Sequence, residues 1–178
     1  MDHGAELTAL LTSGCTPEQA WDLFDRLPAA PVAAITTGRW RGEELDTGHP
    51  WAGVLVESGW YGKQFDDAET VHPLLFADGA GTVFAVDPRR VPFGLAGKVP
   101  LPAIRALRKT LRYTAFTLRT AKPAARLRSI EYRGVISAAM VYDHLPIIDH
   151  FRRVDAGTLL GVMDLRGMAD PYFFVLRS

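Results

Sequence analysis

Apolar and polar residues alternate along the second half of the chain, as they do in half-buried β-strands. Between residues 124 and 132, for example, Leu127 and Ser129 fall on one face, and Arg128 and Ile130 fall on the other. An apolar run predicts a second strand at 135–142, and further strands are expected at 145–154, 158–165 and 172–177. Short turns rich in glycine, aspartate and proline separate these strands, so we expect an antiparallel meander.

The first half of the chain begins with a helical pattern. Thr16 precedes Pro17 and lies three residues before Gln19, an arrangement typical of a capped helix start. Apolar residues then recur at helical spacing until Pro28. We expect this helix to close one end of a β-barrel formed by the predicted strands.

The rest of the first half predicts strands. They are expected at 36–43, 71–76 and 82–86. The stretch 53–61 fits a helix or a strand, and its length does not decide between them.

Together these elements predict a mainly β protein, an antiparallel barrel of about eight strands with an N-terminal helix and one additional amphipathic helix. A chain of 178 residues fits a single domain. Its parts are a helical N-terminal segment (1–30), a part centred on a Gly-X-Trp-X-Gly motif (34–95), a helical insertion (96–120) and a C-terminal strand meander (121–178).

The insertion carries a basic amphipathic pattern at 102–119. Ile104 and Leu107 share a stripe with Leu111, whereas Arg105 and Arg108 lie largely off it. We favour a helix that packs on the barrel wall with a solvated basic face. The alternative is a helix that contacts an anionic membrane surface.

The net charge of zero conceals a division between the two halves. Residues 1–80 hold 4 Lys and Arg against 13 Asp and Glu, and residues 81–178 hold 16 against 7. The division indicates either a cationic surface that attracts carboxylates or phosphates, or pairing between the two halves. Aromatic residues are not interleaved with the basic segment and no known module is present, so we expect no nucleic-acid partner.

The composition is that of a soluble globular protein, with 48% hydrophobic and 22% charged residues. No run of about 18 uncharged apolar residues is present, and the first residues lack the basic start of a secretory signal. The single cysteine, Cys15, excludes an internal disulfide. We therefore expect a cytoplasmic protein; the sequence does not define its oligomeric state.

A glycine–tryptophan motif lies in the first predicted strand. Gly38, Trp40 and Gly42 are spaced as Gly-X-Trp-X-Gly. Glycine allows a tight backbone bend, and an indole can cover one end of a small barrel. This motif is similar to the one that opens the calycin barrels, which include lipocalins and fatty-acid-binding proteins.

The motif, the segments 59–65 and 71–76, and the run 142–155 together resemble a bacterial family. Its N-terminal part is named for the Gly-X-Trp-X-Gly motif, and its C-terminal part is a domain of unknown function. The resemblance covers about Pro17 to Arg177. It implies a lipocalin-like barrel that binds a hydrophobic ligand, and a cation–π contact in which Arg177 packs on Trp40.

The candidate ligand is a lipid-like or fatty-acid-like small molecule held in the barrel cavity. Residues expected to contact it share large aromatic or cationic side chains: Trp51, Trp60, Tyr61, Phe76, Phe84, Tyr142, Phe151, Phe173, Phe174, Arg152 and Arg153. Either Arg152 or Arg153 would hold an anionic head group. Alternation along 147–154 places Asp149 and Arg153 on one face and His150 and Arg152 on the other, and the pattern does not say which face looks inward.

Two other functions fit the same region. An isomerase, cyclase or hydrolase would use Asp143, His144, Asp149 and His150 as acids or bases in an apolar cavity. A haem-binding barrel resembling nitrobindin would use His150 as the ligand. Because metal-binding spacings are absent from the sequence, we expect no metal site, and we favour binding over catalysis.

Overall fold

The computed structural model describes residues 2–35, 38–53, 55, 58–91 and 115–178. Residues 92–114 lie outside this description, and with them most of the amphipathic helix expected at 102–119 and of the insertion at 96–120. The elements in chain order are α1 (His3–Ser13), α2 (Pro17–Arg26), η1 (Val32–Ala34), β1 (Gly38–Glu44), β2 (Trp60–Phe65), β3 (Val71–Ala77), β4 (Val83–Ala85), η2 (Pro88–Arg90), η4 (Ala115–Leu118), β5 (Ala125–Tyr132), β6 (Val135–Tyr142), β7 (Ile147–Arg153), β8 (Thr158–Leu165) and β9 (Tyr172–Arg177).

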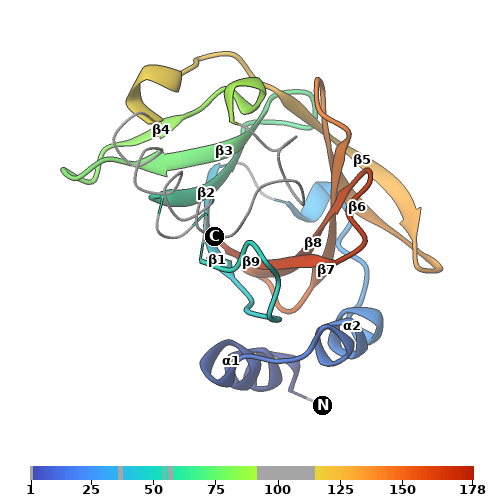
Figure 1. The fold of residues 1–178 in the computed structure, drawn as a ribbon. Coiled ribbons are helices and arrows are strands. Elements are labelled where there is room, and N and C mark those ends of the chain that lie inside the picture. Colours follow the sequence, from blue (N-terminus) through green and yellow to red (C-terminus); the bar gives the residue numbers. More distant parts are fainter. Residues whose placement is uncertain (1, 36–37, 54, 56–57, 92–114) are drawn as a thin grey trace.

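The strands form one antiparallel sheet in the order β2-β1-β9-β8-β7-β6-β5-β3-β4. Because β2 also pairs with β3, the sheet closes on itself into a barrel (Figure 1). Strand β4 pairs with β3 outside this ring. The expected fold, a mainly β antiparallel barrel with an N-terminal helix, is confirmed.

Neighbouring strands of the ring pair over very different lengths. Strands β5 and β6 pair over eight residues, whereas β3 and β5 pair at Val71 and Ala125 alone. The backbone N–H of Ala124 donates to the Val71 carbonyl beside this pair, at 3.0 Å. The β3–β5 contact is therefore the thinnest seam of the barrel.

Strand β2 includes Trp60 and Tyr61, the last two residues of the stretch 53–61 that fitted a helix or a strand. The strand begins at Trp60 and runs to Phe65, between β1 and β3. It supplies a strand that the alternation pattern did not predict. Its register against β3 shifts on both sides of Gly62, and this irregularity hides the strand from a period-two pattern.

Helix α2 has the capped start that the sequence predicts, but its position on the barrel differs from the expected one. The Thr16 side chain accepts from the backbone N–H of Gln19, and the Gln19 side chain accepts from the backbone N–H of Thr16. Its buried side chains, including Phe24, pack with Leu7 of α1 against Val162 and Phe173 on the outer face of β8 and β9. The expectation that this helix closes one end of the barrel is wrong, because both helices cover the outer wall (Figure 1).

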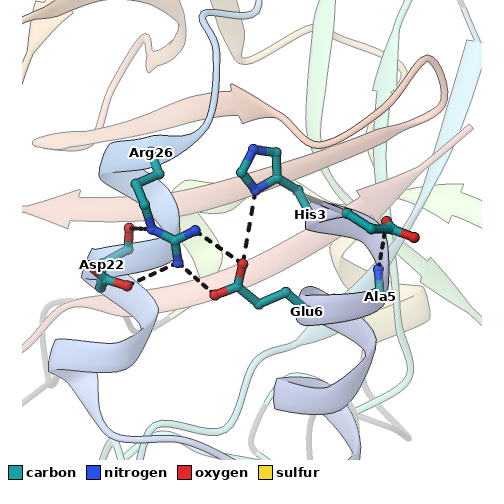
Figure 2. A network of polar contacts seen from close by, with 6 residues as sticks. His3, Ala5, Glu6, Asp22 and Arg26 are labelled. Carbon is teal, nitrogen blue, oxygen red and sulfur yellow. Dashed lines mark hydrogen bonds and ion pairs between the residues drawn. The ribbon is translucent and has the colours of Figure 1, made fainter.

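A polar network joins the two helices on their exposed side (Figure 2). Arg26 of α2 donates to both carboxylate oxygens of Glu6 of α1, at 3.1 and 2.6 Å, and to Asp22 at 2.9 Å. Ion pairs also join the acidic and basic halves of the chain, for example Arg133 with Asp25 at 2.6 Å. Among the described residues, pairing between the halves accounts for part of the charge division.

The barrel interior is lined by apolar and aromatic side chains. Trp40 is 2% exposed and belongs to this core. Gly42 allows the close packing of Trp60, because a Cβ atom at Gly42 would lie 2.2 Å from the Trp60 ring. The Gly-X-Trp-X-Gly motif thus places one indole inside the barrel and makes room for a second.

Candidate functional site

A bulge in β2 turns a lysine into the barrel. Strict alternation would place Trp60 and Lys63 on opposite faces, yet both line the same interior cavity. The face changes at Gly62, whose φ is +144° and whose register against β3 is shifted. A Cβ atom at Gly62 would lie 2.0 Å from the Trp40 carbonyl oxygen, so only glycine fits there.

Lys63 forms a buried ion pair with Asp149 of β7. Its Nζ donates to Asp149 Oδ2 at 2.8 Å and to the Pro73 carbonyl at 3.2 Å. The two charged side chains are 4% and 2% exposed. A charge pair removed from water this completely costs desolvation energy, and replacing such pairs with apolar residues is often neutral or stabilising. The pair is therefore a candidate for function rather than for stability.

Aromatic rings surround the ammonium group. Lys63 Nζ lies 4.9 Å from the ring centroid of Phe174, 5.9 Å from that of Tyr142 and 6.0 Å from that of Trp60. Ring faces attract a cation, and they do so more strongly where water is excluded. The rings therefore offset part of the cost of burying this charge.

A small cavity lies next to the ion pair. Its volume is about 20 Å³, and its walls are Leu55, Trp60, Lys63, Leu74, Tyr142, Asp149, Met163, Tyr172 and Phe174. This space is sufficient for one water molecule. The cavity thus brings together strands from both halves of the chain around one polar pair.

Two polar atoms of the cavity wall are left without a partner. Asp149 Oδ1 and Trp60 Nε1 are buried and make no hydrogen bond to any described residue. Buried polar atoms are nearly always satisfied in native proteins, so each such atom needs an explanation. One acceptor and one donor are therefore free beside the cavity.

Burial controls the protonation of the groups around the cavity. It raises the pKa of Asp149 above its ordinary value, although the neighbouring Lys63 opposes this rise. Burial likewise raises the pKa of Tyr142 and Tyr172 well above that of a free phenol, and Asp149 and Glu44 add to the rise. Both phenols consequently stay protonated and can donate hydrogen bonds.

Glu44 of β1 holds the chain segment that borders the cavity. Its carboxylate accepts from the backbone N–H groups of Gly53, at 2.7 Å, and Leu55, at 3.2 Å, and from the Tyr172 hydroxyl. Burial raises the pKa of Glu44, and these hydrogen bonds oppose the rise. Glu44 thereby fixes two wall residues, Leu55 and Tyr172.

The structure brings together some of the predicted ligand-contacting residues. Trp60, Tyr142 and Phe174 line the cavity, and Phe76, Phe84 and Phe151 belong to the same interior core, with Trp51 packed against it. Tyr61 instead lies under Arg41, whose Cζ is 5.7 Å from the ring, and Phe173 packs beneath the helices.

The predicted arginine anchor lies outside the cavity wall. Arg152 is fully buried beneath α2, with its Cζ 4.9 Å from the Phe24 ring, and it donates to the Tyr132 carbonyl at 2.9 Å. Arg153 is exposed at the end of β7. Neither guanidinium can hold a head group in this cavity, and the cation present there is Lys63.

The Asp/His group predicted for catalysis is dispersed. Asp143 and His144 lie exposed in the turn after β6, where Asp143 pairs with Arg126 at 2.8 Å. Asp149 faces the interior and His150 the outer side, so these four side chains do not form one site. Of the buried ion pair, sequence reasoning identified Asp149 and missed Lys63.

His150 is not placed to hold haem inside the barrel. Its ring stacks on Tyr132 at 3.7 Å, between the strand and the helical layer, and its Nε2 lies 3.9 Å from Asp164. Burial lowers the pKa of His150 to about 4. The ring therefore stays neutral at physiological pH and faces away from the interior.

Arg177 does not pack on Trp40. It pairs in register with Arg41, and side chains directly opposite each other share one face of a sheet. That face is the outer one, where Arg177 lies 3.7 Å from Glu43 and is 44% exposed. The residue in register with Trp40 on the inner face is Lys63.

Comparison with known proteins finds similarity along almost the whole chain. The family model described as GXWXG protein matches residues 22–81, and the model described as Domain of unknown function (DUF4334) matches residues 123–178. The crystal structure of a protein from Thermomonospora curvata is 33% identical, with 99% of this chain and 98% of that chain covered and a TM-score of 0.73. No curated protein matched the sequence. In the part of the chain that the structure describes, no helix is long and apolar enough to cross a membrane.

Proposed function

The chain belongs to the family of GXWXG proteins that carry a C-terminal DUF4334 domain, and we propose that its barrel binds a small, uncharged, mostly apolar molecule through Lys63 and Asp149. The observation that carries the proposal is the buried ion pair beside a cavity, with one carboxylate oxygen unpaired. Binding sites of small molecules are mostly apolar, with a few convergent polar groups.

The charge balance of the site defines the ligand class. Lys63 and Asp149 neutralise one another, so the pocket has no excess positive charge for a carboxylate. A bound carboxylate would also lie against Asp149 Oδ1. Both groups are hydrogen-bond acceptors, so neither could donate to the other. A hydroxyl group can accept from Lys63 and donate to Oδ1 at once. The site therefore favours an alcohol over a fatty acid.

The volume of the cavity limits the size of the ligand. A space of about 20 Å³ does not accommodate a fatty-acid chain. A ligand of a few carbon atoms has to displace flexible wall side chains, and Met163 is the most adaptable of them. The ligand is accordingly smaller than the lipid that the family resemblance implies.

Binding can be measured at the indole of Trp60, whose Nε1 is unpaired in the wall. The chain has four tryptophans, so its indole N–H signals are few in a ¹⁵N-correlated NMR spectrum and a Trp60→Phe variant assigns the one of interest. Butan-1-ol should shift this signal in a saturable manner. Butyrate, with the same chain length and a charge, should bind much more weakly.

The Asp149→Asn variant tests the cause of this preference. It keeps the shape of the side chain and leaves the Lys63 cation unbalanced, so the preference should reverse towards butyrate. Asp164→Asn is the matched control, because Asp164 is exposed on the outer side of β8. A wild-type protein that binds butyrate as well as butan-1-ol, or neither of them, would contradict the proposal.

A further inference from the structure

We propose that Lys63 forms a reversible covalent imine with a small aldehyde or ketone in the cavity, an inference that rests on the binding site proposed above. No other lysine has a comparable position among the described residues: Lys122 is exposed, whereas Lys63 is 3% exposed. An amine becomes a nucleophile when a base takes its proton, and the Asp149 carboxylate in contact with Nζ can act as that base.

The surroundings of Nζ leave room for a reacting carbonyl group. Its three N–H donors meet two acceptors, Asp149 Oδ2 and the Pro73 carbonyl, which leaves one donor direction without a hydrogen-bond partner among the described residues. The other neighbours of Nζ are aromatic rings. A carbonyl carbon in the adjacent cavity would therefore meet the amine without competition from protein groups.

Asp149 can take part in two proton transfers of the reaction: it takes the ammonium proton and later protonates the leaving hydroxyl group. Its Oδ2 lies 2.8 Å from Nζ, within reach of the ammonium proton. Its Oδ1 has no partner and is free to meet the hydroxyl group that forms on the former carbonyl carbon. A carboxylate with one occupied and one free oxygen beside an amine can thus serve both steps.

The atoms and charges balance without a further reagent. Lys63 gives a proton to Asp149, and the lone pair of the neutral amine forms a bond to the carbonyl carbon. The π electrons move to the oxygen, which takes up a proton from the nitrogen and becomes a hydroxyl group. Asp149 returns its proton to this hydroxyl, which leaves as water. An ammonium and a carbonyl become an iminium and water, and the charge stays at one positive unit.

The site also stabilises the product. The iminium keeps the positive charge within the same group, beside the restored Asp149 carboxylate and the three rings that surround Nζ. The contacts that stabilise the Lys63 ammonium group would therefore also stabilise the positive charge of the iminium.

Reductive trapping tests the proposal. Folded protein is incubated with butanal and cyanoborohydride, which reduces an imine to a stable amine, and the modified lysines are found by peptide mass spectrometry. The chain has four lysines, so each site can be followed separately. Lys63 should be alkylated faster than exposed Lys122, and butan-1-ol should protect Lys63 and leave Lys122 unchanged. Asp149→Asn should slow trapping at Lys63 by roughly 100-fold.

The outcomes separate this inference from the proposed function. A saturable Trp60 shift with butan-1-ol, together with trapping at Lys63 no faster than at Lys122, overturns the imine and leaves the binding site standing. Absence of both the shift and the Lys63 adduct overturns both. Asp164→Asn, on the outer side of β8, should trap as the wild type does, and an equal loss in both aspartate variants would refute the role of Asp149.

Discussion

Removing the Lys63 charge should destabilise the protein far more than removing the whole ion pair. Lys63→Met keeps an unbranched side chain of similar size and leaves the Asp149 carboxylate buried without its cation. Both side chains are less than 5% exposed and their charged atoms are 2.8 Å apart, so the free energy of unfolding at pH 7 should fall by about 3–5 kcal/mol. In Lys63→Met/Asp149→Leu neither charge of the pair remains, and the stability should return to within about 1 kcal/mol of the wild type or exceed it.

The pH dependence of the single variant has a definite sign. Burial raises the folded-state pKa of Asp149, and the loss of Lys63 removes the interaction that opposes this rise. A carboxyl group with a raised folded-state pKa favours folding while it is protonated, and this contribution is lost as the pH rises through that pKa. The deficit of Lys63→Met should therefore shrink as the pH falls towards the ordinary pKa of aspartate.

Urea unfolding at several pH values, followed by circular dichroism, measures both effects if the transitions are two-state. Wild type, the two single variants and the double variant form a complete thermodynamic cycle. A double variant as unstable as the sum of the singles would show that the pair supports the fold. The argument that it is kept for ligand binding would then be refuted.

Three further predictions concern other parts of the fold. Gly62→Ala should destabilise the barrel by more than about 2 kcal/mol, because its Cβ would overlap the Trp40 carbonyl, whereas Gly79→Ala, in open space, should change stability by less than about 1 kcal/mol in the same urea assay. Because the pKa of His150 is lowered to about 4, the protein should lose about 3 kcal/mol from this group as the pH falls from 6.5 to 4, and His150→Phe should flatten that part of the stability curve. Arg26→Gln, which breaks the network of Figure 2, should cost less than about 1.5 kcal/mol, with a smaller effect at high salt; a larger loss would show that the two helices depend on this exposed contact.

Most of the barrel could be predicted because its strands are short alternating or apolar runs that end at turn residues. The capped start of α2 was equally clear, since Thr16 and Gln19 use their side chains on neighbouring backbone groups. What the local pattern could not give was the face on which α2 packs. That depends on Leu160, Val162, Phe173 and Val175, which make the covered part of the outer face of β8 and β9 apolar like the inner face, so alternation does not distinguish inside from outside there.

The candidate site escaped prediction for a related reason. Asp149 was identified from its alternation on β7, whereas Lys63 lies on the strand that the pattern did not predict. One irregularity at Gly62 both obscures β2 and turns the lysine inward. The sequence does contain a lysine next to a glycine between Trp60 and Phe65. That spacing alone does not show that the lysine points inward, because its direction is set by the bulge at Gly62.

The seam between β3 and β5 defines how the barrel can yield. A closed ring shares any strain among its contacts, and the contact with the fewest shared residues separates at the lowest free energy. Leu74 of the cavity wall and Pro73, which holds the lysine, are both on β3. Parting of these two strands would leave the long β5–β6 hairpin paired, and the strand that it releases on one side is the one that contacts the buried ion pair.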